Sequence, residues 1–118
     1  ASKTVRLLLL TMLCAVLGLA QQDRGTIVGT VTDPSGSIIP NVKVTVRQVE
    51  REPIQLETNS AGQYRVPNLP IGNYRVTFES QGFKTIVREN VQLNVAQVLA
   101  VDAQLQVGSV AETVEVTA

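Results

Sequence analysis

The sequence predicts an all-β fold: one antiparallel sandwich of seven or eight short strands, preceded by an apolar segment. From Gly25 onward, apolar and polar residues alternate with a period of two, which is the spacing of a half-buried strand. Clusters of Gly, Pro, Asn, Asp and Ser interrupt the alternation at short intervals, as turns do. No segment after Gln21 has helical spacing. Many short strands joined by tight turns are typical of two packed sheets.

The alternation defines eight strands and the face of each that is buried. The predicted strands cover residues 25–32, 42–50, 54–59, 63–66, 73–80, 83–93, 97–107 and 112–117. Where the alternation is clearest, the residues predicted to share the apolar face of their strand are Ile27, Gly29, Val31, Val42, Val44, Val46, Tyr74, Val76, Phe78, Leu99, Val101, Ala103, Leu105 and Val107. The few aromatic side chains lie on these strands, so we expect them in an aliphatic core.

Turn residues separate these strands in order along the chain. Asp33-Pro34-Ser35-Gly36 ends the first strand, and an Ile39-Pro40 step precedes the second. Ser60-Ala61-Gly62 follows the third strand, the stretch 67–72 follows the fourth, and Gln81-Gly82 follows the fifth. Proline presets φ for a turn and glycine accepts a positive φ, so each cluster predicts a chain reversal.

The spacing Leu69-x-x-Gly72-x-Tyr74 predicts a tyrosine corner. In that arrangement the tyrosine hydroxyl donates a hydrogen bond to the backbone a few residues upstream. Gly72 allows the backbone to turn there without a Cβ clash. Plain core packing of Tyr74 is compatible with this interpretation, and neither makes the residue a binding site.

Composition argues against catalysis and against nucleic-acid binding. The chain has 118 residues, no His, no Trp and one Cys, and ten basic residues balance ten acidic ones. A basic field that could hold nucleic acid is therefore absent from the sequence. Without histidine, Ser-His-Asp and Cys-His nucleophile pairs and the commonest metal ligand are missing. We therefore predict no catalytic, cofactor-binding or metal site, and the scarcity of aromatic residues does not support carbohydrate binding.

Residues 1–20 have the layout of a secretory signal peptide. Lys3 and Arg6 precede an apolar run over 7–19, and small residues at Gly18 and Ala20 suit cleavage. Cys14 lies inside this run, so the sandwich itself is expected to hold without disulfides. The alternative interpretation is an apolar arm that is retained and buried by a neighbouring subunit or a membrane.

Several of these motifs together resemble the carboxypeptidase regulatory-like domain, a small transthyretin-like or immunoglobulin-like sandwich found on secreted and outer-membrane proteins. The resemblance rests on the segments 29–36, 39–46, 58–64 and 69–74. It implies a non-catalytic module without a cofactor. The residues expected to shape its turns and core are Gly29, Asp33, Gly36, Pro40, Gly62, Tyr64, Leu69, Gly72 and Tyr74.

The C-terminal stretch 107–118, ending Val-Glu-Val-Thr-Ala, looks like the segment that joins this domain to the plug of TonB-dependent outer-membrane receptors. We therefore divide the chain into a leader or arm (1–20), the sandwich (21–107) and a linker or strand (108–118). The resemblance implies a secreted protein of the bacterial cell surface or outer membrane.

Two functions follow from the sequence, both of them with protein partners. The first is an accessory or interaction domain of a cell-surface receptor. The second is a structural subunit of an extracellular filament assembled by strand exchange, because an exposed sheet edge can accept another chain's strand. The candidate donor residues are Leu8, Leu10, Val114 and Val116.

Overall fold

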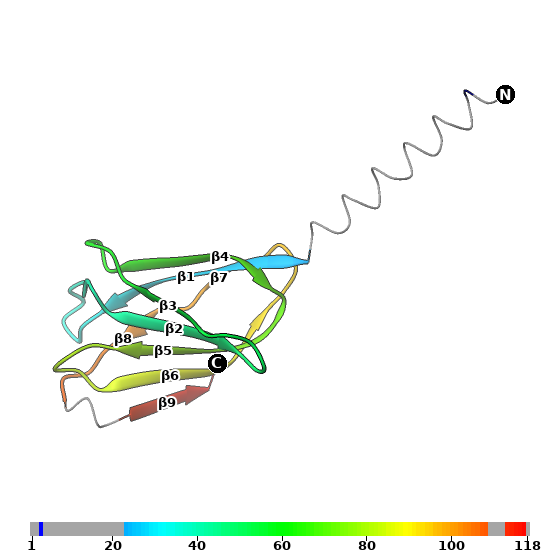
Figure 1. Cartoon of the computed structure of the whole chain (residues 1–118). Helices are drawn as coiled ribbons and strands as arrows, with labels where there is room; N and C mark the ends of the chain where they lie inside the picture. The colour runs from blue at the N-terminus through cyan, green and yellow to red at the C-terminus, as the bar shows by residue number, and fades with distance from the viewer. Residues whose placement is uncertain (1–2, 4–22, 109–112, 118) are drawn as a thin grey trace.

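The computed structural model describes residue 3 and residues 23–108 and 113–117, and within these ranges every named element is a β-strand (Figure 1). The strands are β1 (Arg24–Thr32), β2 (Lys43–Gln48), β3 (Ile54–Glu57), β4 (Gln63–Pro70), β5 (Gly72–Glu79), β6 (Thr85–Leu93), β7 (Val98–Ala100), β8 (Ala103–Gln104) and β9 (Thr113–Thr117). The predicted all-β fold is confirmed. The candidate arm residues Leu8 and Leu10 lie outside the described residues.

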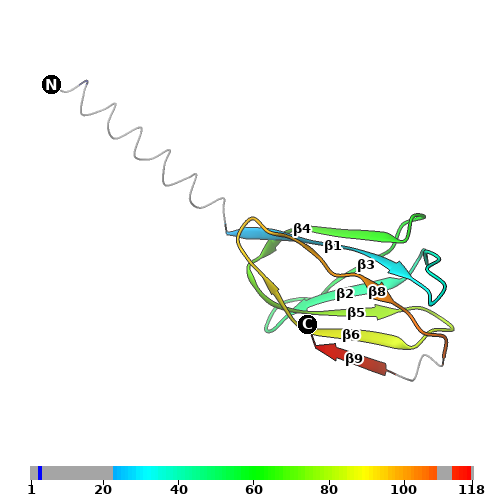
Figure 2. The same cartoon turned by 180° about the vertical axis from the view of Figure 1, so that it is seen from behind.

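The strands form two facing sheets. One sheet has the order β4-β1-β7, and β8 also pairs with β1; the other has the order β3-β2-β5-β6-β9. Figure 2 shows β7 and β8 following β1 on the side turned away in Figure 1. In this order β3 and β4 are edge strands of different sheets. The sandwich therefore has an open side where these two edges face each other.

Three of the strand pairings are parallel, whereas the sequence analysis expected an antiparallel sandwich throughout. β7 and β8 run parallel to β1, and β9 runs parallel to β6. The other ladders are antiparallel. The chain crosses between the two sheets before β7 and again before β9, and β8 continues beside β1 after β7, so these strands add beside a partner distant in sequence. Alternation shows which face of a strand is buried but carries no information on the direction of its neighbour.

The predicted strand over 97–107 is interrupted at Asp102. Val101 N–H donates to the Val28 carbonyl at 2.7 Å and Leu105 N–H donates to the Thr32 carbonyl at 2.8 Å. Between them, Thr30 N–H donates to the Asp102 carboxylate at 2.8 Å. A side-chain oxygen thus replaces a main-chain acceptor, and the ladder divides into β7 and β8. Two further corrections are at the ends of the predicted strands: Val107 is 73% exposed, and β4 continues to Pro70.

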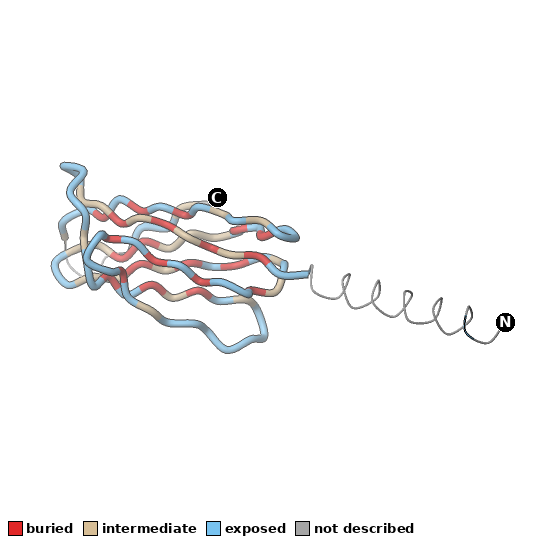
Figure 3. The backbone as a smooth tube through the Cα atoms, turned by 90° about the horizontal axis from the view of Figure 1, so that it is seen from above, coloured by how far each residue is buried: buried red, intermediate tan, exposed pale blue. Residues whose placement is uncertain are grey.

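An aliphatic core fills the space between the sheets, and buried residues alternate with exposed ones along most strands (Figure 3). Phe78 is fully buried, and its ring meets that of Tyr64 edge-on with the centroids 5.8 Å apart. The remaining core residues are Ile27, Val31, Val42, Val44, Val46, Val66, Leu69, Tyr74, Val76, Ile86, Val91, Leu93, Val101, Ala103 and Leu105. No helix within the described ranges is long and apolar enough to span a bilayer.

Candidate functional site

The open side of the sandwich begins where β3 and β4 separate. Asn59 N–H donates to the Gln63 carbonyl at 2.9 Å, and Gln63 N–H donates to Asn59 Oδ1 at 3.0 Å. The same carboxamide oxygen accepts the Ala61 N–H at 3.0 Å. Gly62 completes the turn at φ 71°, a left-handed conformation that glycine adopts without steric cost. These bonds tie the two edges together at one end, and beyond them β3 stays with one sheet while β4 joins the other.

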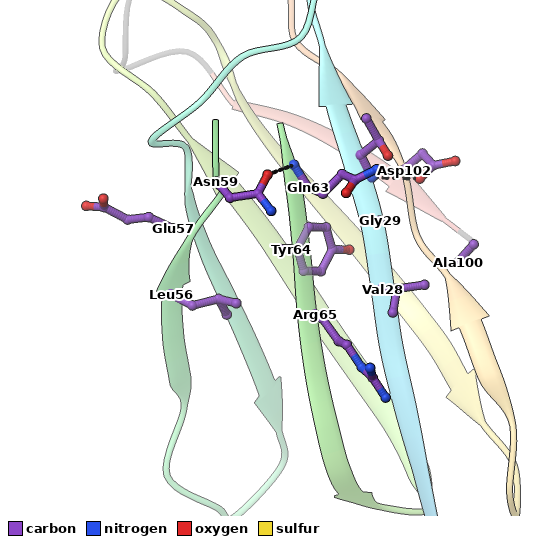
Figure 4. A pocket seen from close by; sticks show the side chains of 11 residues that line it. Val28, Gly29, Leu56, Glu57, Asn59, Gln63, Tyr64, Arg65, Ala100 and Asp102 are labelled. Carbon is purple, nitrogen blue, oxygen red and sulfur yellow. Dashed lines mark hydrogen bonds between the residues drawn. The ribbon is translucent and has the colours of Figure 1, made fainter. Parts of the chain in front are cut away.

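A hollow of about 680 Å³ lies along this side and extends over β1 toward the β7–β8 connection. In Figure 4, Leu56 points from β3 toward Tyr64, whereas Glu57 points away on the opposite face of its strand. We call the part between the two edges the β3–β4 groove. Its residues are Leu56, Glu57, Asn59, Gln63, Tyr64 and Arg65.

Tyr64 forms the inner wall of the β3–β4 groove and is held in one position. Its side chain is 4% exposed, and its hydroxyl donates to the Val101 carbonyl at 2.5 Å. Burial, with a further contribution from the negative charge of Asp102, raises the pKa of this hydroxyl well above its ordinary value. Tyr64 therefore stays protonated and acts as a hydrogen-bond donor, not as a general base.

Gly29 on β1 makes room for this tyrosine. A Cβ atom at position 29 would lie 2.6 Å from Cε1 and 2.8 Å from the hydroxyl oxygen of Tyr64, and it would also overlap the Val101 carbonyl oxygen. Glycine is therefore required here for close approach and not for a turn. The residue that the sequence analysis placed on the core face of the first strand thus lies directly behind the groove.

Asp102 lines the hollow on the side of the β7–β8 connection. Its carboxylate accepts the Thr30 N–H, and its main-chain carbonyl accepts a bond from Arg88 Nη2 at 2.9 Å. Arg88 reaches this carbonyl from β6, so it connects the two sheets on the side opposite the groove. Its buried Nε has no hydrogen-bond partner in the described part of the chain.

The other residues singled out in the sequence lie away from the groove and shape turns. Asp33 accepts bonds from Ser35 N–H, Ser35 Oγ and Ser37 N–H at 2.9, 2.6 and 3.0 Å. The hydrogen bond from the Ser35 hydroxyl is the main cause that lowers the pKa of Asp33, and hydrogen bonds from main-chain N–H groups lower it further. Gly36 has φ 89° in the same turn, and Pro40 is exposed just before β2.

The tyrosine-corner residues lie together at the β4–β5 connection. Tyr74 donates its hydroxyl hydrogen bond to the Pro70 carbonyl at 2.5 Å, which is the geometry of such a corner. Leu69 is 2% exposed, and Gly72 opens β5 with φ 143°. Burial raises the pKa of Tyr74 as well.

Two of the candidate strand-exchange residues, Val114 and Val116, lie on β9. They pair with Ile86 and Arg88 of the same chain's β6. Val114 is 38% exposed, so β9 is a lightly buried edge strand. The structure thus shows this strand added to its own sheet.

The groove has the groups for contact but lacks an arrangement for acid–base or nucleophilic chemistry. The Tyr64 hydroxyl, the Asp102 carboxylate and the Asn59 carboxamide oxygen each already take part in an internal hydrogen bond. Glu57 and Arg65 have no ion-pair partner among the described residues, and the same residues contain no cluster of three potential metal ligands.

Sequence reasoning found Gly29, Gly62 and Tyr64 but missed Leu56, Asn59 and Asp102. Alternation within 54–59 indicates that Leu56 faces inward, and Asn59 stands in a turn cluster. Neither pattern says that the third and fourth strands belong to different sheets. For Asp102, no local signal distinguishes a ladder-breaking carboxylate from an ordinary exposed one.

Comparisons with known proteins agree with this description. Residues 26–106 match the carboxypeptidase regulatory-like domain. The chain is 31% identical over 96 residues to the TonB-dependent transporter Oar of Myxococcus xanthus, which covers 77% of this chain but only 9% of that protein. The chain therefore spans about a tenth of this relative.

Solved structures share the fold at low identity. The TIE protein of Bacillus anthracis superposes with a TM-score of 0.61 at 14% identity, covering 72% of this chain and 17% of that one. Catechol 1,2-dioxygenase of Acinetobacter radioresistens superposes with a TM-score of 0.57 at 12% identity, covering 84% of this chain and 59% of that one. At these identities the likeness concerns the fold alone.

Proposed function

Because the chain belongs to the carboxypeptidase regulatory-like domain family, we propose that it is a non-enzymatic accessory domain of an outer-membrane receptor, working outside the cytoplasm through protein contacts. The observation that carries the proposal is the alignment to a TonB-dependent transporter over most of this chain. The two-sheet sandwich and its open edge groove support it. In this proposal the predicted leader over 1–20 directs export and is removed near Gln21.

Cell fractionation tests the location. Antibodies raised against the chain should detect a polypeptide much longer than 118 residues in the outer-membrane fraction of the source cells. A cytoplasmic enzyme and an integral outer-membrane protein serve as fractionation markers. Recovery of a small protein in the cytoplasmic fraction would overturn the proposal.

A second measurement addresses the binding role. A photoreactive amino acid placed at Glu57, an exposed residue of the β3–β4 groove, should cross-link to another envelope protein in intact cells. The matched control is the same amino acid at Val49, which is 82% exposed and is not among the groove residues. Equal yields at both positions would indicate nonspecific contact and would contradict a role for the groove.

The filament subunit remains the alternative. With the C-terminal strand as donor, strand exchange would require β6 to receive β9 from another copy, whereas here β9 pairs within its own chain. The other candidate donor, the arm with Leu8 and Leu10, lies outside the described residues. Electron microscopy of the purified full chain distinguishes the two functions, because only the alternative predicts filaments.

A further inference from the structure

We propose that the free edge of β3 binds an extended peptide segment of a partner protein, one that carries basic residues on one face and apolar residues on the other. This inference rests on the proposed function, in which the domain works through protein contacts, and it names the chemistry of the partner. The bound segment would add a sixth strand to the β3-β2-β5-β6-β9 sheet and lie in the β3–β4 groove.

The register of β3 shows which of its main-chain groups are available. Thr58 N–H donates to the Val42 carbonyl at 3.0 Å, so the main-chain N–H of Thr58 is directed toward the β2 side. In an antiparallel ladder every second residue bonds to the partner strand, and the pairs Leu56–Val44 and Ile54–Val46 follow in that alternation. The N–H and C=O groups of Gln55 and Glu57 are therefore directed away from β2, toward the groove.

Both edges are bounded by a proline and by the Asn59–Gln63 bonds, but β4 has fewer free groups than β3, whose free residues lie between Pro53 and Asn59. Gln63 already bonds through both its N–H and its carbonyl to Asn59. Two residues further along, only Arg65 offers free groups, and the next outward position is Pro67, which has no N–H. Prolines are a usual means of protecting an edge strand from pairing. A docking strand would therefore pair with β3 and only contact β4.

The side chains along the groove define what the docked segment should carry. Its inward side chains would meet Leu56, which is half-buried, and the ring of Tyr64. Its outward side chains would lie beside Glu57, which is exposed and has no ion-pair partner in the described part of the chain. Charge complementarity thus favours lysine or arginine at the outward positions.

The same charges argue against a second copy as the occupant. Of the edge strands that another copy could offer, β9 and β3 each have a carboxylate and no basic residue, β7 has no charged residue, and β4 contains Pro67 and Pro70, which have no N–H. Placed on β3, β9 would bring Glu115 close to the Glu57 carboxylate. A partner with basic outward residues avoids this repulsion.

The test uses the full chain and a fluorescently labelled peptide, Lys-Val-Thr-Val-Arg, with blocked ends. Binding is followed by fluorescence anisotropy against two control peptides: Glu-Val-Thr-Val-Glu, and the basic peptide with alternate amides N-methylated. We expect binding of the unmodified basic peptide and about tenfold weaker binding of both controls, because one loses the charge match and the other loses the main-chain bonds. Equal binding of all three peptides would overturn the proposal, and so would a failure of the basic peptide to bind.

Two matched proline variants locate the site on the protein. Gln55→Pro removes an outward N–H from β3 and should weaken binding about tenfold, whereas Arg65→Pro removes an outward N–H from β4 and should change it by less than about twofold. Neither N–H belongs to a ladder bond, and melting curves check that both variants fold. Equal losses in the two variants would contradict docking on β3.

A charge exchange provides a test that needs no backbone change. Glu57→Lys should weaken binding of the basic peptide and strengthen binding of the acidic one, and an unchanged preference would contradict the charge argument. Light scattering at the same concentrations should show one copy of the chain per complex, because a dimer would make a second copy the occupant. These results do not depend on where the protein resides, so they can fail independently of the fractionation experiment.

Discussion

Replacing Tyr64 with phenylalanine tests how the inner wall of the groove is held. The variant keeps the ring packing but removes the hydroxyl that donates to the Val101 carbonyl at 2.5 Å. The acceptor lies in the buried region between β1 and the β7–β8 connection, where Val101 is 8% exposed. Leaving a buried carbonyl without its partner costs about 1–3 kcal/mol. For a domain of this size that corresponds to a fall in melting temperature of roughly 4–8 °C per kcal/mol.

The pH dependence of the same variant gives a sharper readout. Burial raises the pKa of the folded Tyr64 hydroxyl above its ordinary value of 10.0, so the protonated side chain stabilises the folded state. This contribution is complete below the unfolded pKa and is lost as the pH rises through the folded pKa. Between pH 9 and pH 11, the unfolded chain releases the proton and the folded chain retains it. Linkage then predicts that the wild type loses about 1.4 kcal/mol that the phenylalanine variant does not lose.

The assay is urea denaturation followed by circular dichroism at pH 9 and pH 11, with Tyr74→Phe as the matched control. The Tyr74 hydroxyl bonds to the Pro70 carbonyl at a less buried place, so its removal should cost less at pH 9. The reasoning would be refuted if Tyr64→Phe and the wild type had the same stability at pH 9. It would also be refuted if the two showed the same loss of stability from pH 9 to pH 11.

Three further substitutions test the core, the close contact between Gly29 of β1 and Tyr64, and the first turn. Val44→Asp places an unpaired charge at a fully buried site and should cost several kcal/mol, enough to abolish the thermal transition, whereas Val49→Asp at an 82% exposed site should leave it within a few degrees. Gly29→Ala forces a Cβ into the Tyr64 ring and should therefore destabilise the fold more than Gly36→Ala. At Gly36 the space is open and only the positive φ opposes the change, which costs about 1 kcal/mol. The reverse order of stability in urea titrations would contradict the geometry. Asp33→Asn tests the lowered pKa of that carboxylate, whose stabilising effect is present above the unfolded pKa of 3.8 and is lost as the pH falls through the folded pKa. Acid should therefore lower the unfolding free energy of the wild type more than that of the variant. Parallel stability curves of the two proteins in acid would refute this.

Local pattern accounts for much of what the sequence predicted. Alternation placed Ile27, Val44 and Phe78 on the core face, and the structure buries all three. The spacing around Gly72 anticipated the bond that Tyr74 makes to Pro70. These features depend on residues close together in the chain: the period of side chains along a strand and the backbone demands of a turn. For that reason a single sequence suffices to predict them.

The β3–β4 groove, in contrast, was decided by the tertiary structure. Whether β3 and β4 share a sheet depends on pairings with strands distant in sequence, and side-chain alternation is the same for either neighbour and for either direction. The parallel placement of β7 beside β1 and the role of Asp102 as a ladder acceptor arise from the same long-range choice. The free groups of Gln55 and Glu57 are likewise set by the register with β2. The sequence determined which residues form strands and which faces they bury; the packing of those strands determined which edge remains open for a partner.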